Sequence, residues 1–282
     1  MPEETEKEKI RKMVREGYAD IAKTSSSCCD PDRSASPCCS PATAEDISKK
    51  IGYNESDLAS VPEGANLGLG CGNPTAFASL REGETVLDLG SGAGFDCFLA
   101  ANKVGPTGRV IGVDMTPDML EKARENARKG NYENVEFRLG EIENLPASDN
   151  SIDVIISNCV INLSPDKPRV FHEALRVLKP GGRLMVSDMV LLKELPKFVK
   201  ESMHAYIGCV AGAIMKDDYI GAITKAGFQK VEIIDETHYE IKGITNDRTI
   251  NKVMEELNIP MEKLMELDGA VVSVKVSARK PN

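Results

Sequence analysis

Short apolar runs alternate with helical segments along the chain between Thr85 and Asp188. Runs rich in β-branched residues follow one another as TVLDLG, RVIGVDM, VEFRLG, IDVIISNCV and RLMVSDM. Between them stand FDCFLAANKV, PDMLEKARENARK and PRVFHEALRVL, whose apolar residues recur at helical spacing. Because strands that alternate with helices form βαβ units with right-handed crossovers, the pattern predicts an α/β fold with a doubly wound parallel sheet. Ligands of such sheets bind at the carboxyl ends of the strands.

A glycine-rich turn follows the first of these strands and opens the first helix. It reads Asp88-Leu89-Gly90-Ser91-Gly92-Ala93-Gly94, and its glycines allow the backbone to approach a ligand closely. Asp114 ends the second strand, where an acidic side chain can accept hydrogen bonds from ribose hydroxyls. These two features alone would also fit NAD.

Three further features resemble the class I methyltransferases, which have a seven-stranded sheet. The turn has the form GxGxG in place of GxGxxG, Asp88 stands two residues before the first glycine, and the fifth strand is reached through ALRVLKPGGRLMVSD. The resemblance implies that the cofactor is S-adenosylmethionine, with Gly140-Glu141-Ile142 near its adenine. The implied cofactor-binding residues are Asp88, Gly90, Gly92, Asp114, Met115, Glu141 and Ile142. The alternative is a nucleotide-binding or catalytically inactive version of the fold.

With this cofactor, the chain divides into three parts. Residues 1–75 hold an N-terminal helix and a cysteine-rich loop, since apolar residues recur at helical spacing over positions 10–21. Residues 76–192 are the Rossmann-like domain that binds S-adenosylmethionine. Residues 193–282 contain a mostly helical insert and two strand-like runs, VEIIDETHYEIKG and AVVSVKVSARK. We expect this last part to form an α+β cap over the open edge of the sheet.

The composition favours a small-molecule substrate. Acidic residues outnumber basic ones by 44 to 35, and the formal net charge of −9 opposes binding to nucleic acid phosphates. Trp is absent and aromatic residues make up 5%, which leaves little material for a base-stacking surface. No run reaches the roughly 18 apolar residues of a membrane span, and the charged start MPEETEKEKIRKMVREGY is unlike a signal peptide. We therefore expect a cytoplasmic protein that binds neither nucleic acid nor membrane. We also expect it to be a monomer.

The cysteines of the chain form two groups. Two adjacent pairs, Cys28-Cys29 and Cys38-Cys39, lie in SSSCCDPDRSASPCCSP, whereas Cys71, Cys97, Cys159 and Cys209 stand singly. Because the cytosol keeps structural thiols reduced, we interpret the 8 cysteines as ligands, redox groups or core residues. Cys159 ends the fourth strand, Cys209 lies in the expected cap and Cys71 precedes the first strand. These three can converge where the reactive methyl group should point.

Five ordered motifs give a closer resemblance, which covers roughly residues 66 to 230. They are LGCGNP, LDLGSGAGFDCF, IGVDMT, ISNCVINLSPDK and GCVAGA. Together they closely resemble the arsenite methyltransferases of microbes and animals. The resemblance implies that Cys71, Cys159 and Cys209 bind arsenite. The chain departs from the animal members at Tyr206-Ile207-Gly208, where those proteins carry an aromatic-acidic pair.

Thiolate ligands suit this chemistry, because trivalent arsenic is soft and thiophilic. Three thiolates leave a pyramidal arsenic whose lone pair can attack the sulfonium methyl in line, at roughly 3 to 3.5 Å. No general base is needed, and His172, His204 and His238 belong to no catalytic motif. We predict that these histidines are structural or face solvent. Cys97, beside Phe98 below the glycine turn, is predicted to be a core residue.

The arsenite methyltransferase pattern includes an N-terminal cysteine that reduces arsenic after methylation by forming a disulfide with Cys71. Either cysteine pair can supply it, and Cys29 is favoured because the family's loop precedes a Ser-Pro step, here Ser40-Pro41. The alternatives are metal binding and a redox-inert loop, although CC…CC lacks the CxxC spacing of a structural zinc site. Thioredoxin or glutathione would restore the thiols.

We predict an arsenite methyltransferase that acts on arsenite and methylarsenite in arsenic detoxification. Its products would be mono- and dimethylated arsenicals, and trimethylation stays open. One alternative is a class I methyltransferase of another small metabolite, such as a quinone or sterol, which would need a general base or an apolar substrate tunnel. A second is a non-catalytic protein that binds metalloids.

Overall fold

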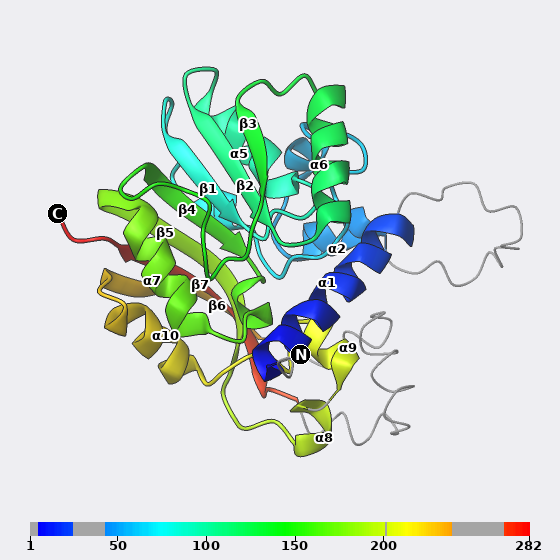
Figure 1. The fold of residues 1–282 in the computed structure, drawn as a ribbon, viewed down its shortest axis with the longest axis vertical. Helices are drawn as coiled ribbons and strands as arrows, with labels where there is room; N and C mark the ends of the chain where they lie inside the picture. The colour runs from blue at the N-terminus through cyan, green and yellow to red at the C-terminus, as the bar shows by residue number, and fades with distance from the viewer. Residues whose placement is uncertain (1–4, 25–42, 201, 239–267) are drawn as a thin grey trace, which may run out of the picture.

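The computed structural model describes residues 5–24, 43–200, 202–238 and 268–282. Within these ranges, one seven-stranded sheet runs in the order β3-β2-β1-β4-β5-β7-β6 (Figure 1). The strands β1 to β5 pair in parallel, and β7 lies antiparallel between β5 and β6. The strands are β1 (Thr85–Leu89), β2 (Arg109–Asp114), β3 (Val135–Leu139), β4 (Ile152–Asn158), β5 (Leu178–Leu191), β6 (Gln229–His238) and β7 (Val271–Arg279).

Helices cover both faces of the sheet, because strand side chains alternate between the faces. Val86 and Ile156 pack with apolar residues of two helices on one face. Leu87 and Leu89 pack with two other helices on the opposite face. The first pair of helices is α5 (Phe95–Val104) and α6 (Pro117–Lys129), and the second is α7 (Lys167–Val177) and α10 (Lys216–Lys225). The sheet therefore forms the middle of three layers.

Helix α1 (Glu6–Thr24) lies across the carboxyl end of the sheet and packs against α6 and α9 (Figure 1). Its Val14 is buried in a cluster with three cysteines. None of the described helices is long and apolar enough to cross a membrane. The shorter helices are α2 (Ala44–Lys50), α3 (Glu55–Ala59), α4 (Pro74–Phe77), η1 (Ile161–Leu163), α8 (Lys197–Lys200) and α9 (Met203–Ile207).

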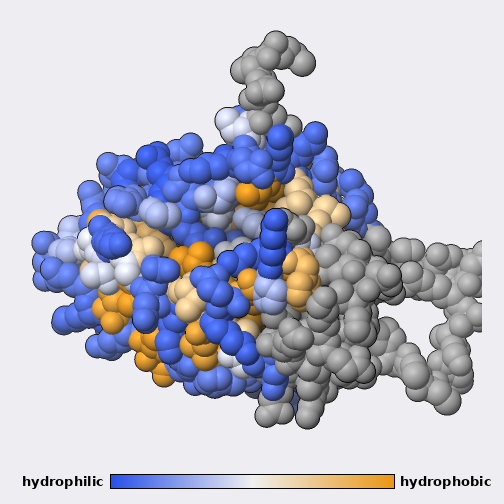
Figure 2. All heavy atoms as spheres, turned by 90° about the horizontal axis from the view of Figure 1, so that it is seen from below, coloured by the Kyte–Doolittle hydropathy of each residue, from blue (hydrophilic) through white to orange (hydrophobic). Residues whose placement is uncertain are grey.

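The surface in Figure 2 is mostly hydrophilic where it is described, with hydrophobic side chains in separate patches. Among the described residues, the large apolar side chains that are exposed belong to Leu69, Leu139, Leu192, Met203, Ile233 and Ile234. Such scattered apolar residues are ordinary on a protein surface.

The strands and helices expected from the sequence are confirmed between Thr85 and Asp188. Residues 193–282, expected to form a cap, need a different description. Strands β6 and β7 extend the main sheet, because Val272, Val274 and Val276 are buried in the same core as the residues of β5. The boundary drawn at residues 192 and 193 therefore cuts through one continuous sheet.

A buried ion pair joins the amino end of β5 to the residue before β1. Arg183 Nη1 and Nη2 donate to Glu84 Oε1 and Oε2, each at 2.8 Å. Only 10% of the Arg183 side chain and 14% of the Glu84 side chain are exposed. The two parallel bonds of such a pair are strong, but each charge depends on its partner to offset the loss of water.

Replacing Glu84 with Gln should lower the free energy of unfolding by about 3 kcal/mol, because Arg183 would stay buried without a charged partner. Urea unfolding followed by circular dichroism measures this loss. The control is Glu136→Gln on β3, where Glu136 pairs with Arg109 and Arg138 and its side chain is 41% exposed. That change should cost less than about 1 kcal/mol. Equal losses in the two variants would contradict the assignment.

Candidate active site

The glycine turn between β1 and α5 packs closely against β2 and against Val160. Gly90 has a φ of +67°, a conformation that L side chains rarely adopt. A Cβ atom at this position would lie 2.3 Å from Cγ2 of Val160. The N–H groups of Gly90 and Ser91 donate to the carbonyl of Val113 at 2.8 and 3.0 Å, which ties the turn to β2. Only glycine therefore fits at this point.

Asp114, at the end of β2, organises the same turn. Its Oδ2 accepts from the N–H of Gly92 at 2.9 Å, and its Oδ1 accepts from the N–H of Thr116 at 2.8 Å. Burial raises the pKa of this carboxyl, and the two backbone donors oppose that shift by stabilising the ionised form. Because Asp114 also lines the cavity, its carboxylate is positioned to accept from ribose hydroxyls while it holds the turn.

A cavity opens above the turn and encloses about 1080 Å³, its open mouth included. The hydroxyl of Ser91 on its wall is buried and has no hydrogen-bond partner among the described residues. A Cβ atom on Gly92 would meet nothing within 4 Å. The cavity thus offers space, a free hydroxyl and a ribose acceptor, which fit S-adenosylmethionine. The predicted cofactor-binding residues that line it are Asp88, Gly90, Gly92, Asp114, Met115 and Ile142.

Glu141 is the predicted cofactor-binding residue that does not line the cavity. Its carboxylate pairs with Arg11 and Arg15 of α1, at 3.3 and 3.6 Å. The neighbouring Glu143 does line the cavity. Its Oε1 accepts from the Ser164 hydroxyl at 2.7 Å. The chain segment after β3 therefore holds α1 in place as well as forming a cavity wall.

Helix α1 supplies a wall of the cavity through Arg11, Val14 and Tyr18. The hydroxyl of Tyr18 donates to the carbonyl of Ile207 at 3.3 Å, which links α1 to the segment before Cys209. The sequence predicted this helix without a role at the site. The apolar stripe of α1 indicated that one face of the helix is buried. It does not indicate which surface of the protein that face covers.

Asn158, the last residue of β4, connects the Cys71 loop to the cofactor side of the site. Its Oδ1 accepts from the N–H of Cys71 at 3.0 Å, and its Nδ2 donates to the carbonyl of Gly72 at 2.8 Å. The same Nδ2 lies 2.9 Å from the Tyr53 hydroxyl and 3.1 Å from Oδ2 of Asp96. Burial raises the pKa of Asp96 to about 6, although its hydrogen bonds with Tyr53 and Asn158 act to lower this pKa.

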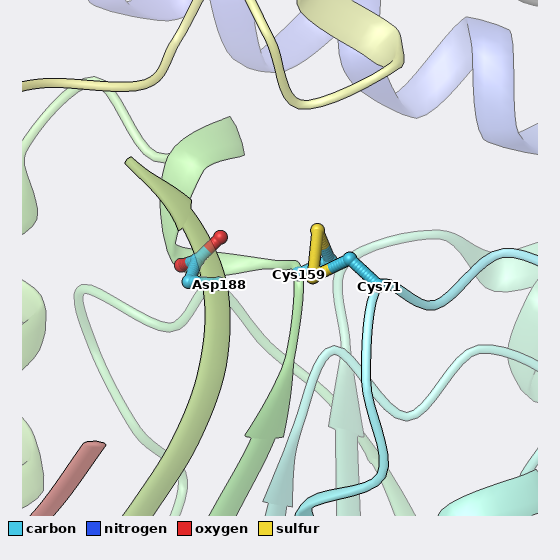
Figure 3. A group of neighbouring side chains, drawn as sticks. All are labelled: Cys71, Cys159 and Asp188. Atoms are coloured by element: carbon cyan, nitrogen blue, oxygen red, sulfur yellow. A yellow bond between two sulfur atoms is a disulfide. The ribbon is translucent and has the colours of Figure 1, made fainter. Parts of the chain in front are cut away.

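Cys71, Cys159 and Cys209 meet in one buried cluster, although they come from three distant segments. A disulfide joins Cys71 to Cys159, whose Cα atoms are 5.8 Å apart (Figure 3). The thiol of Cys209 donates to the carbonyl of Cys159 at 2.7 Å. Burial raises the pKa of the Cys209 thiol well above its usual range. Because Cys159 also lines the cavity, the sulfur cluster lies directly beside the cofactor space.

Asp188, near the end of β5, is the third member of a compact group with Cys71 and Cys159 (Figure 3). The two sulfur atoms and a carboxylate oxygen of Asp188 all lie within 4.8 Å of one another. Asp188 is fully buried. Burial raises the pKa of this carboxyl to about 7. Sequence reasoning missed this residue, because the Ser-Asp end of β5 was assigned to the fold alone.

The remaining predicted residues fall into three groups. Cys97 is fully buried in the core, as predicted, and its thiol donates to Oδ2 of Asp88 at 3.2 Å. His172 and His238 are exposed, as predicted. Cys28, Cys29, Cys38 and Cys39 lie outside the described residues, as does the side chain of His204.

The fold and the cavity define a class I methyltransferase that uses S-adenosylmethionine. A family model described as a methyltransferase domain matches residues 80–232. The chain is 52% identical to the arsenite methyltransferase of Halobacterium salinarum, over 93% of this chain and 67% of that protein. The chain belongs to the arsenite methyltransferase family.

Two further comparisons agree. The arsenite methyltransferase of Aquipseudomonas alcaligenes is 37% identical over 80% of this chain and 64% of its own length. The crystal structure of an arsenic(III) S-adenosylmethionine methyltransferase from Chlamydomonas reinhardtii matches with a TM-score of 0.60 and 34% identity. That match covers 86% of this chain and 75% of the solved one. The chain thus spans about two thirds of the length of these two relatives.

Replacing Asp114 with Ala should weaken S-adenosylmethionine binding at least about 10-fold, which corresponds to about 1.4 kcal/mol. The loss removes both the ribose acceptor and the bonds that order Gly92 and Thr116. Isothermal titration calorimetry measures the affinity. The control is Asp118→Ala, since Asp118 stands nearby in α6 and pairs with Lys23. Unchanged affinity in Asp114→Ala would show that the cofactor does not contact the end of β2.

Proposed function

We propose that this chain transfers methyl groups from S-adenosylmethionine to trivalent arsenic bound by Cys71, Cys159 and Cys209. The observation that carries the proposal is the convergence of these three buried cysteines beside the cofactor cavity. Membership of the arsenite methyltransferase family supports the same substrate. Methylation of another small metabolite would have no use for the three cysteines, and a binding-only protein would have no use for the cavity.

Arsenic can bind all three sulfurs only after a thiol reductant opens the disulfide between Cys71 and Cys159. A thioredoxin-type protein or glutathione supplies two electrons and two protons, and itself becomes a disulfide. Arsenite then exchanges its three hydroxyl groups for three cysteine sulfurs and releases three water molecules. The need for a reductant fits a cytoplasmic setting, which is part of the proposal. We also propose that the enzyme works as a monomer.

The protein's part in methyl transfer is to hold arsenic in line and keep water away. The cofactor, when bound, supplies an electrophilic methyl group on its sulfonium sulfur. Three thiolates leave the arsenic lone pair free to attack that methyl group. Val14, Leu163 and Tyr206 pack over the sulfurs and exclude water from them. Arsenic carries no proton that has to be removed, so a general base is not required.

The arsenic must return from the pentavalent to the trivalent state before a second transfer. Two cysteines can supply the electrons: a free thiolate attacks a cysteine sulfur that is bound to arsenic, the two sulfurs form a disulfide, and the electron pair of the broken arsenic–sulfur bond stays on arsenic. We propose Cys71 as the bound cysteine and an N-terminal cysteine, Cys29 for preference, as the one that attacks it. The disulfide between Cys71 and Cys159 supports a role for Cys71 in such exchange. Mono- and dimethylated arsenicals are the proposed products.

Replacing Cys71 with Ser should abolish methylation of arsenite but retain methylation of methylarsenite. Monomethylated arsenic offers only two positions to sulfur, and the loop cysteine is the one that can be released. Cys159→Ser and Cys209→Ser should lose both activities, by more than the roughly 10- to 100-fold that loss of an outer ligand contact costs at a metal site. Chromatography with arsenic-specific detection measures the products.

The matched control for this series is Cys97→Ser, because Cys97 is buried but bonds to Asp88 instead of facing the sulfur cluster. It should keep both activities. Equal losses in the three ligand variants would reject the release of Cys71. Full activity of Cys159→Ser would reject arsenic as the substrate.

Replacing Cys28, Cys29, Cys38 and Cys39 together with Ser should spare methylation of methylarsenite supplied in reduced, thiol-bound form. Multi-turnover methylation of inorganic arsenite should fall most, because that cycle needs the reduction step. The measurement is the number of methyl transfers per enzyme molecule on each of the two substrates, with glutathione as the reductant. If arsenite turnover stayed at the level of the unmodified chain, the N-terminal cysteines would have no place in the relay.

A further inference from the structure

We infer that the carboxylate of Asp188 stabilises the positive charge that reaches arsenic during methyl transfer. The inference rests on the proposed function, because it needs arsenic at the cysteine cluster. It assigns a role in the reaction to a residue of β5 that the cysteine ligands and the cofactor cavity leave unexplained.

The location of Asp188 places a carboxylate beside the reacting atom. One of its oxygens lies within 4.8 Å of the sulfur atoms of Cys71 and Cys159. In Figure 3 the carboxyl group and the two sulfurs face the same space above the strand ends. Arsenic bound to these sulfurs would therefore lie within a few ångströms of the carboxylate.

The contacts of Asp188 hold this group in place without neutralising it. Oδ1 accepts from the N–H of Met189 at 3.0 Å, and Oδ2 accepts from the hydroxyl of Tyr219 at 3.0 Å. Asp188 makes no ion pair within the described part of the chain. The buried Lys167 acts on the charge of Asp188 without a direct ion pair. A buried carboxylate that lacks a direct ion pair is costly for a fold, which favours a functional reason for its presence.

The reaction moves a positive charge toward Asp188. The arsenic lone pair forms the arsenic–carbon bond, the sulfur–carbon bond of the cofactor breaks, and its electron pair stays on sulfur. Arsenic starts as a neutral centre with three sulfur neighbours and ends as a tetrahedral cation with three sulfurs and one methyl group. A fixed carboxylate beside it is more favourable in the transition state than in the ground state, and such differential interaction raises the rate.

Another buried group makes this compensation more necessary. The ammonium of Lys167 donates to the carbonyls of Asn162 and Ser164, at 3.3 and 3.1 Å. It lies close enough to Asp188 and Cys209 to interact with their charges. The positive charge that forms on arsenic would be repelled by this ammonium, because the site excludes water. Asp188 offsets that repulsion, since opposite charges interact strongly where the dielectric is low.

The experiment compares Asp188→Asn with Tyr219→Phe. The first change keeps the shape of the side chain and removes its charge, whereas the second removes one of its hydrogen bonds and keeps the charge. With arsenite and a thiol reductant, kcat of Asp188→Asn should fall about 100-fold, as for loss of a preorganised electrostatic partner. Equilibrium dialysis of arsenite and calorimetry of S-adenosylmethionine should show affinities within about 3-fold of the unmodified chain.

The Tyr219→Phe variant should keep kcat within about 5-fold, because Asp188 keeps its charge and its hydrogen bond from the N–H of Met189. It also keeps the test decisive if Asp188→Asn does not fold. A 100-fold loss of kcat in Tyr219→Phe with intact binding would overturn the inference, as would normal kcat in Asp188→Asn or a loss confined to affinity. An unmodified chain that binds arsenic but transfers no methyl group would instead reject the proposed function itself.

Discussion

The hydrogen bonds of the Asn158 side chain hold the site together. Asn158 ends β4 and is followed directly by Cys159, so it stands where the thiol cluster and the cofactor cavity meet. Its amide oxygen accepts from the N–H of Cys71, and its amide nitrogen donates to the carbonyl of Gly72. Its nitrogen also reaches Asp96 at the start of α5, the helix that the glycine turn opens. The position of Cys71 is thereby coupled to the structure that binds the cofactor.

The backbone conformation at Cys159 and Cys209 is strained and lowers the stability of the fold. Cys159 has a φ of +61° and Cys209 a φ of +64°, both in the left-handed region that residues with a side chain rarely occupy. Each such residue costs about 1 to 3 kcal/mol and persists where the surroundings enforce it. Here the conformation turns each chain segment sharply and brings Cys209 to within hydrogen-bond distance of the Cys159 carbonyl. Strain at both cysteines and at no neighbouring described residue of the cluster agrees with a role in ligand binding.

The sequence predicted the parts of this structure that depend on local pattern. The runs TVLDLG and IDVIISNCV contain strands β1 and β4, and the glycine turn lines the cavity as expected. These features could be predicted because turn geometry and side-chain alternation depend on residues that are neighbours in the sequence. The sheet position of β7, the cover by α1 and the place of Asp188 depend on contacts between distant segments. A periodic pattern shows that a face is apolar but not what it covers, so these features needed the structure.

The central claim is that three cysteines from distant segments bind one arsenic atom beside the cofactor. X-ray absorption spectroscopy at the arsenic edge, on the reduced chain with one equivalent of arsenite, tests it most directly by counting the atoms bound to arsenic. We predict three sulfur neighbours and no oxygen for arsenite, and two sulfurs with one carbon when methylarsenite is bound instead. An arsenic that keeps oxygen neighbours, or a count that does not change when Cys209 is replaced by Ser, would contradict it.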